Sequence, residues 1–266
     1  MRREPGRRRD LLLGAELALL YAFLYAPILV LVVLSFNASG LPTSWGGFST
    51  RWYGELARSG DLLAALRTSA TIAVIVTVVS TAIGTLLALG LERTVRSTFL
   101  DAVVFLPAVV PDIVLAIGLL SFFSVVRITL GSHTVILAHV VFDMVFVAAI
   151  VRARLGYFDR SIEEAAQDLG AGRVATFFRV TVPVLLPGIL AGALIAFTLS
   201  FDEFIIAFFT AGPTVITFPI RIYSMIRFGV TPVVNAVATL ILALSITLVL
   251  LALRLTRREA RRAVEG

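Results

Sequence analysis

Six long apolar segments, separated by shorter polar ones, constrain this chain more than any other feature of its sequence. They are Leu17–Ser35, Leu66–Leu91, Ala102–Val125, Thr134–Val151, Leu186–Ala211 and Val233–Leu255. A helix needs about 17–25 mainly apolar residues to cross the hydrocarbon core of a bilayer, and each segment reaches that length. Because 59% of the 266 residues are hydrophobic, little sequence remains for a soluble domain. We therefore predict an all-α membrane protein with six transmembrane helices.

The distribution of arginines predicts how these helices are oriented. Six spans place both termini on the same side of the membrane. Of the 23 basic residues, all of them arginines, 17 fall in the segments on the side of the termini and 6 in the segments on the opposite side. Cytoplasmic loops carry the excess of basic residues, so we predict that both termini are cytoplasmic. The same bias accounts for the net charge of +6 without any nucleic-acid partner.

This assignment divides the chain into predicted regions. They are a basic cytoplasmic amino terminus (1–16), a first transmembrane helix (17–35), a periplasmic loop (36–65), a five-helix membrane core (66–255) and a cytoplasmic tail (256–266). Within the core, residues 152–183 form a cytoplasmic loop that is too polar to lie in lipid.

Missing residue types limit the chemistry that this chain can perform. It contains no lysine, so it has neither a P-loop for ATP nor a Schiff-base amine. It contains no cysteine, which excludes disulfides and zinc–thiolate sites. Two histidines, His133 and His139, are too few for a histidine cluster. We predict no catalytic site, metal site or cofactor in this chain, and if ATP drives it, another subunit binds the nucleotide.

The polar stretch Ser161–Pro183 is predicted to form two short helices joined by glycines. Ser161 and Glu164 have the spacing of a capping box, and Gly170 and Gly172 supply the break. We expect Pro183 to end the second helix. That helix is expected to carry one face made of Val174, Phe177, Phe178 and Thr181. A helix pair at the membrane surface needs a partner to dock on.

The spacing within this stretch resembles the EAA loop of ABC importer permeases. Glu164-Ala165-Ala166 is followed by three residues, Gly170, nine residues and Val180-Thr181-Val182-Pro183. The family pattern is EAA, x3, G, x9, I, x, L, P, with valine here at both apolar places. Other segments resemble spermidine/putrescine permease subunits of the PotC type, and the similarity runs from the second span to the end. These segments are Pro111–Leu120, Glu163–Ala171, Phe197–Phe204 and Ile220–Leu240.

The resemblance implies a type I ABC importer permease in the bacterial inner membrane. Its partners would be a second homologous permease, two copies of an ATP-binding subunit that holds ATP and Mg²⁺, and a periplasmic or lipid-anchored solute-binding protein. The contact with the ATPase would be made by Glu164, Ala165, Ala166, Gly170 and Pro183. Glu164 also has a simpler role open to it, as part of a capping box worth about 0.5–2 kcal/mol, and both roles can hold together.

Four carboxylates, Asp112, Asp143, Asp202 and Glu203, lie within the predicted spans. A charge at the bilayer centre costs roughly 2.5–3.5 kcal/mol on insertion scales, and the basic residues within the predicted spans, Arg67 and Arg254, lie at span ends. We expect these residues to line a path that attracts cations, which would suit a polyamine. The structural alternatives are protonation, hydrogen bonding between helices or, for Asp112 after Pro111, covering an amide that is freed at a kink.

Other functions fit the same residues. A related ABC permease could carry a different small solute, such as an opine-like amine. A secondary transporter, from a different class of protein, would move protons through the four carboxylates and would transport without any ATPase. A membrane-embedded hydrolase is disfavoured, because nothing in the sequence places either histidine beside a nucleophile.

Overall fold

The computed structural model describes residues 6–41, 44–93, 97–227, 229, 231–243 and 246–247. Within these residues the regular structure is helical, apart from an isolated bridge between Asn37 and Phe48, so the all-α prediction is confirmed for the described part. The chain divides into two units, residues 61–221 and residues 1–60 with 222–266. The predicted tail 256–266 and the last residues of the predicted sixth span lie outside the described residues.

The unit formed by residues 1–60 and 222–266 begins with helix α1 (Gly6–Leu34), in which the apolar stretch Leu13–Leu34 has no buried residue. A tight turn around Asn37 follows. The Asn37 side chain is fully buried, accepts from the backbone N–H of Ser39 and Gly46, and donates to the carbonyl of Ser44. Helix α2 (Arg51–Arg58) comes next, and Pro232–Ala243 is also helical.

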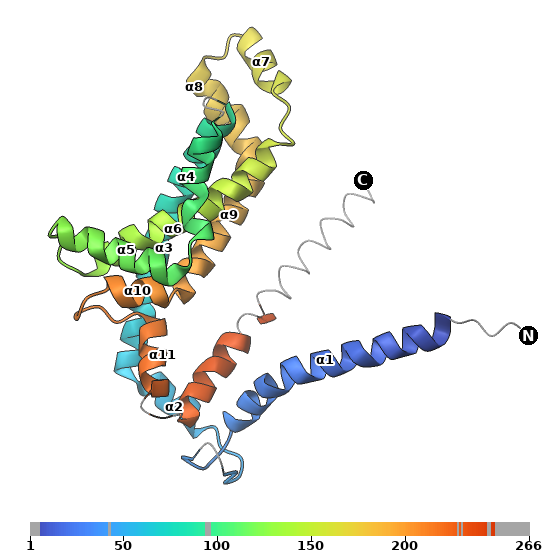
Figure 1. The fold of residues 1–266 in the computed structure, drawn as a ribbon, viewed down its shortest axis with the longest axis vertical. Helices are drawn as coiled ribbons and strands as arrows, with labels where there is room; N and C mark the ends of the chain where they lie inside the picture. Colours follow the sequence, from blue (N-terminus) through green and yellow to red (C-terminus); the bar gives the residue numbers. More distant parts are fainter. Residues whose placement is uncertain are drawn as a thin grey trace, which may run out of the picture. The chain divides into compact units, whose positions relative to one another are not determined.

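The unit formed by residues 61–221 holds most of the helices. They are α3 (Gly60–Arg93), α4 (Thr98–Val109), α5 (Asp112–Val125), α6 (Ser132–Leu155), α7 (Ser161–Asp168), α8 (Arg173–Thr176), the π-helical turn η1 (Phe177–Thr181), α9 (Val182–Asp202) and α10 (Ile205–Thr210), with α11 (Phe218–Arg227) at the division between the units. Helices α4, α6 and α9 run side by side. Helices α7 and α8 lie at one end of them, and α5 and α10 lie toward the other (Figure 1).

Within the described residues, four helices are long and apolar enough to cross a membrane, namely Leu13–Leu34, Gly60–Arg93, Ser132–Leu155 and Arg173–Asp202. A fifth span results if α4 and α5 are counted together. An integral, multi-pass membrane protein follows from these helices. Of the predicted sixth span, Pro232–Ala243 is a shorter apolar helix.

Two of the predicted spans are not continuous helices. The predicted third span, Ala102–Val125, consists of α4 and α5, which are bent by 105°. Val110 is extended there because the ring of Pro111 disfavours helical geometry in the residue before it. The predicted fifth span, Leu186–Ala211, is also broken, because α9 ends at Asp202 and Glu203 is extended. Both breaks lie beside intramembrane carboxylates.

Glycines allow α3, α6 and α9 to approach closely. A Cβ added at Gly84 of α3 would lie 2.6 Å from the backbone oxygen of Met144 on α6, and one added at Gly192 of α9 would lie 3.1 Å from Val147. Small residues at such crossings are the usual means by which membrane helices pack. Around them lies a buried cluster that includes Ala88, Val147, Val151, Leu185 and Ala196.

Replacing Gly84 by alanine should therefore weaken the packing of α3 against α6. The new methyl group would meet backbone, which cannot rotate away, so the helices must separate at a cost of about 1–3 kcal/mol. Gly90 lies on the same helix with nothing within 4 Å of an added Cβ, and alanine there should leave stability unchanged or raise it, since alanine favours helix. Thermal unfolding of both variants in detergent measures the difference. Equal melting temperatures would contradict the predicted clash.

Candidate functional site

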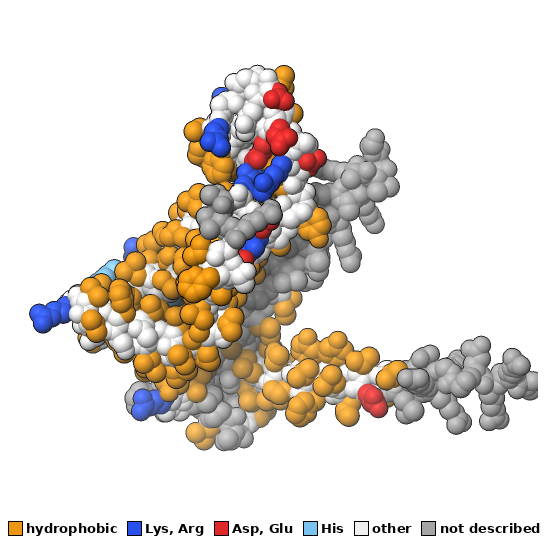
Figure 2. Space-filling view, turned by 45° about the horizontal axis from the view of Figure 1, so that its top comes forward, with side chains coloured by type: hydrophobic (Ala, Val, Ile, Leu, Met, Phe, Trp, Pro, Cys, Tyr) orange, Lys and Arg blue, Asp and Glu red, His pale blue; other side chains and the backbone are white. Residues whose placement is uncertain are grey.

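The loop that contains the EAA pattern lies at the end of the unit where α3 ends. Charged side chains gather over this end in the space-filling view, whereas the flanks of the unit are largely hydrophobic (Figure 2). Of the residues predicted to touch a partner, Glu164, Ala165, Gly170 and Pro183 are exposed and Ala166 is half-buried. Large apolar side chains beside them are also exposed. These are Leu169 at 90%, Val174 at 73% and Phe178 at 63%.

The predicted capping box at Ser161 is wrong. Helix α7 begins at Ser161 itself, and Arg160 occupies the capping position without a side-chain hydrogen bond. The cap comes instead from Asp159, whose Oδ1 accepts from the backbone N–H of Ser161 at 2.9 Å. This bond and the Ser161 hydroxyl hold the pKa of the Asp159 carboxyl below its ordinary value. Glu164 is consequently released from capping and exposed.

Gly170 forms the turn that separates the two short helices. Its φ is +89°, in the left-handed region that favours glycine. Its N–H donates to the carbonyl of Gln167, and the N–H of Ala171 donates to the carbonyl of Ala166, which closes the end of α7. Gly172, by contrast, has φ −67° and ψ 158°, a conformation that any residue adopts. The break therefore depends on Gly170 rather than on both glycines.

The second short helix differs from the prediction in its face and in its end. Thr181 is buried, whereas Val174 and Phe178 are exposed, so the four predicted residues do not share one environment. The π-helical turn Phe177–Thr181 explains this, because an extra residue in a turn rotates the following side chains by about 100°. Pro183 does not end the helix, because it is the second residue of α9, which continues the helical stretch Arg173–Asp202.

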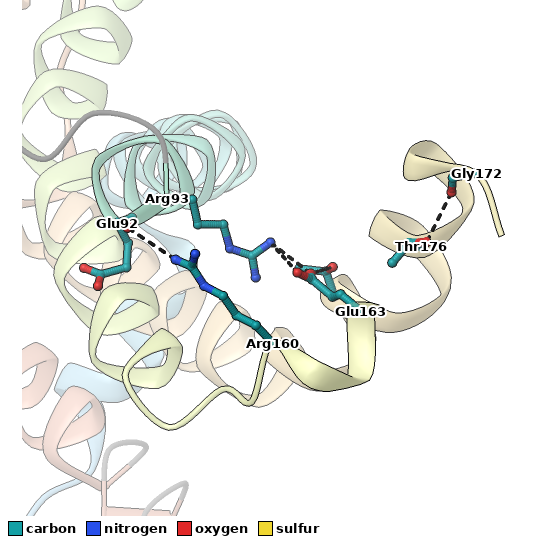
Figure 3. Close-up of polar contacts among 7 residues, drawn as sticks. Glu92, Arg93, Arg160, Glu163, Gly172 and Thr176 are labelled. Atoms are coloured by element: carbon teal, nitrogen blue, oxygen red, sulfur yellow. Dashed lines mark hydrogen bonds and ion pairs between the residues drawn. The ribbon is translucent and has the colours of Figure 1, made fainter. Parts of the chain in front are cut away.

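Glu163, which was not among the predicted site residues, points inward from α7. Its carboxylate accepts from Arg93 Nη1 at 2.9 and 3.1 Å (Figure 3). It also accepts from the Thr181 hydroxyl. Only 15% of its side chain is exposed. Of two adjacent glutamates, Glu163 thus turns toward α3 and Glu164 stays exposed. The sequence signal was Arg93, a basic residue just after the end of the predicted second span.

A second group of charges lies beside this pair. Arg152 at the end of α6 donates from Nε to Glu92 at 3.1 Å, and from Nη1 and Nη2 to Asp101 at 2.8 and 3.2 Å. Glu92 precedes Arg93 at the end of α3, and Asp101 lies in the first turn of α4. Arg160 adds a longer bond of 3.5 Å to the Glu92 carbonyl (Figure 3).

The four intramembrane carboxylates interact electrostatically through Glu203. Glu203 lies within electrostatic range of Asp112, Asp143 and Asp202, which come from α5, α6 and α9. Among the described residues, none of the four forms an ion pair with an arginine. Glu203 also accepts from the N–H of Ile206 at 2.9 Å and so caps α10. No group of three or more potential ligands in the described residues has an arrangement suited to a metal ion.

Asp143 is the most deeply buried of these carboxylates. It is 1% exposed, and neither of its oxygens has a hydrogen-bond partner within the described residues. His139, one turn earlier on α6, is 2% exposed; its Nδ1 lies 2.9 Å from the Ser200 hydroxyl of α9, and its Nε2 has no described partner. Asp202 is exposed and Asp112 half-buried. An unpaired carboxylate in this position favours a cation.

Comparisons with known proteins found a family and relatives whose sequences are similar to most of this chain. Residues 80–262 match the family described as binding-protein-dependent transport system inner membrane component. The putrescine transport system permease protein PotI of Escherichia coli K12 is 43% identical over 249 residues, covering 90% of this chain and 86% of PotI. The spermidine/putrescine transport system permease protein PotC of the same strain is 38% identical over 253 residues, covering 94% and 96%.

A solved structure supports the fold. The crystal structure of a bacterial ABC transporter involved in the import of the acidic polysaccharide alginate contains a chain that matches with a TM-score of 0.70 and 18% identity, covering 94% of this chain and 96% of that one. At this identity the likeness concerns the fold alone. By the family match and these relatives, the chain belongs to the binding-protein-dependent inner membrane components, the permease subunits of ABC importers.

Proposed function

We propose that this chain is one permease subunit of an ATP-driven importer of polyamines such as putrescine and spermidine. The observation that carries the proposal is its 38–43% identity to putrescine and spermidine/putrescine permease subunits over at least 90% of its length. The carboxylates around Glu203 are consistent with this solute, because a polyamine carries several positive charges that they would attract.

Within this proposal, Asp112, Asp143, Asp202 and Glu203 contribute to the path of the solute. Clustered carboxylates repel one another in a medium of low dielectric constant, and the ammonium groups of a passing polyamine would relieve that repulsion. Asp143 is the strongest candidate, since its oxygens have no described partner. Glu203 has a structural task as well, because it caps α10.

The proposed arrangement in the membrane is that of a type I permease with six helices and both termini cytoplasmic. It is supported by the excess of arginines on one side, 17 of 23. The proposed regions are residues 1–16, 17–35, 36–65, 66–255 and 256–266, as assigned above. The inner membrane of a bacterium is the proposed location, since the family description names it.

The proposed partners follow from the family. They are two copies of an ATPase subunit that binds ATP and Mg²⁺, a second permease, and a periplasmic or lipid-anchored binding protein. Glu164, Ala165, Ala166, Gly170 and Pro183 are proposed to contact the ATPase. Supporting this, the loop presents exposed apolar side chains among polar ones, which is typical of a surface that a partner covers.

Transport by the reconstituted complex tests the proposal. Liposomes that contain this chain, the second permease and the ATPase should take up labelled putrescine only with ATP and loaded binding protein. Liposomes without the ATPase should take up none. Uptake that is driven by a proton gradient without the ATPase would instead establish a secondary transporter. Titration of the binding protein with putrescine, spermidine and an opine-like amine distinguishes the solutes.

A further inference from the structure

Helix α7 is attached to the membrane spans by polar contacts rather than by apolar packing. None of its residues is buried, and Ile162 is 46% exposed. Glu163 is the residue of α7 that reaches toward the end of α3 (Figure 3). Tightly packed side chains transmit a displacement from one helix to another. Because α7 has few such apolar contacts with the spans, its apolar side chains can transmit little movement to them.

The ion pair between Glu163 and Arg93 can connect α7 to the spans in place of apolar packing. Arg93 Nη1 binds both carboxylate oxygens, and 22% of the Arg93 side chain and 15% of the Glu163 side chain are exposed. The Arg93 guanidinium also lies 5.2 Å from the ring of Phe158, which precedes α7. By contrast, Asp61 in the pair Arg221–Asp61 is 79% exposed, and exposed pairs contribute little.

Three segments meet at this contact. Glu163 belongs to α7, Arg93 to α3, and Thr181, whose hydroxyl donates to Glu163, to the π-helical turn that leads into α9. The partners are distant in sequence, with Arg93 and Glu163 separated by 70 residues. A displacement of Glu163 therefore acts at once on the end of α3 and on the start of α9.

Glu92, the residue before Arg93, connects the end of α3 to two further helices, α6 and α4. Glu92 accepts from Arg152 of α6, and Arg152 binds Asp101 of α4. Because Glu92 and Arg93 are neighbours at the end of one helix, any movement of that end is shared between both groups of ion pairs. The charges thus form a continuous path from the loop to α3, α4 and α6.

We propose that Arg93 and Glu163 are positioning residues that make α7 and the end of α3 move as one body when the ATPase acts on the loop. Glu92, Arg152 and Asp101 pass that movement on to α6 and α4. This role rests on the proposed function for the partner that moves the loop. The test measures movement as well as transport, because coupling requires that the two ends respond together.

Arg93→Gln, Glu163→Gln, the double variant and the exchanged pair Arg93→Glu with Glu163→Arg are assayed in the intact complex in liposomes. The single variants should keep the ATPase bound and hydrolyse ATP within about twofold of the unaltered complex, while putrescine uptake per ATP falls about tenfold. The double variant should lose no more than either single one. The exchanged pair should recover part of the uptake.

Two exposed residues supply matched controls. Arg160→Gln removes an arginine of the same loop that makes a single bond of 3.5 Å, and Asp168→Asn removes a carboxylate of α7 that is exposed. Both should leave uptake per ATP unchanged. If the Arg93 and Glu163 variants lose uptake only in proportion to lost ATPase subunit, the pair merely holds the fold and the proposal is overturned.

A second measurement does not depend on the solute. The chain contains no cysteine, so spin labels can be placed at Asp168→Cys on α7 and Leu86→Cys on α3, both of them exposed positions. With Arg93 and Glu163 intact, the distance between the labels should be the same with and without ATP. With Glu163→Gln it should change on ATP binding. An equal response with and without the pair would overturn the proposal, whereas absent putrescine uptake by the unaltered complex would contradict only the proposed solute.

Discussion

Replacing Gly170 by valine is expected to abolish most transport while the chain still inserts into the membrane. The φ of +89° at Gly170 lies where a β-branched residue is a strong outlier, and left-handed backbone costs roughly 1–2 kcal/mol even for ordinary residues, which is a factor of about 5–30 in an equilibrium. The loop would abandon the turn that places Ala165 and Leu169 on the exposed surface. Putrescine uptake by the reconstituted complex, and the amount of ATPase that co-purifies, measure the effect.

Serine at Gly170 and at Gly172 provides the matched control. Neither position has an atom within 4 Å of an added Cβ, so steric clash plays no part at either. At Gly172 the backbone conformation suits serine, which is also a favourable residue at the start of a helix. Transport should fall with Gly170→Ser and stay unchanged with Gly172→Ser. Normal uptake by Gly170→Val would remove this turn from the ATPase contact.

Replacing Asp143 by leucine is expected to stabilise the isolated chain and to impair its transport. The carboxylate is 1% exposed and has no hydrogen-bond partner among the described residues. Removing such a group from the middle of a span gains roughly 2.5–3.5 kcal/mol on insertion scales. If Asp143 meets the cationic solute, the same change removes the attraction, and uptake should fall by more than about tenfold. Opposite changes in thermal stability and in uptake distinguish function from packing.

Asparagine at position 143 separates charge from shape. It keeps the size of the side chain and its ability to form hydrogen bonds but carries no charge. Uptake should be lost with asparagine as well as with leucine if charge attracts the solute. Full uptake by Asp143→Asn would show that hydrogen bonding suffices, and full uptake by both variants would exclude Asp143 from the path. Melting temperatures in detergent ensure that neither result reflects unfolding.

The local features of the loop could largely be predicted from the sequence. Gly170 was expected to supply the break between the two short helices and does so with a positive φ, because a glycine turn depends on the residue and its immediate neighbours. The starts and ends of the helices were predicted less accurately. Asp159 rather than Ser161 caps α7, and the helix continues through Pro183, which was expected to end it. In both cases a shift of one or two residues assigns a different role to the same side chain.

The intramembrane carboxylates, too, could be predicted from the sequence in part and were decided by the tertiary structure in part. Their presence and the absence of arginine away from the span ends were evident from the sequence, since hydropathy identifies the spans without knowledge of packing. Asp202 and Glu203 were expected inside one continuous helix, whereas α9 ends at Asp202 and Glu203 caps the next helix. Their positions relative to Asp143 and Asp112 depend on two helix breaks, of which the one before Asp112 follows from Pro111.

By itself the sequence determined the membrane class, the helical character of the chain, its arginine bias and the glycine turn of the loop, because each follows from hydropathy, charge or local backbone preference. The tertiary structure alone decided that Glu163 rather than Glu164 turns inward, and that Arg93, 70 residues away, is its partner. Local spacing fixes which residues share a helix, but it carries no information about which other helix approaches each face. The ion pairs at the end of α3 arise from that approach.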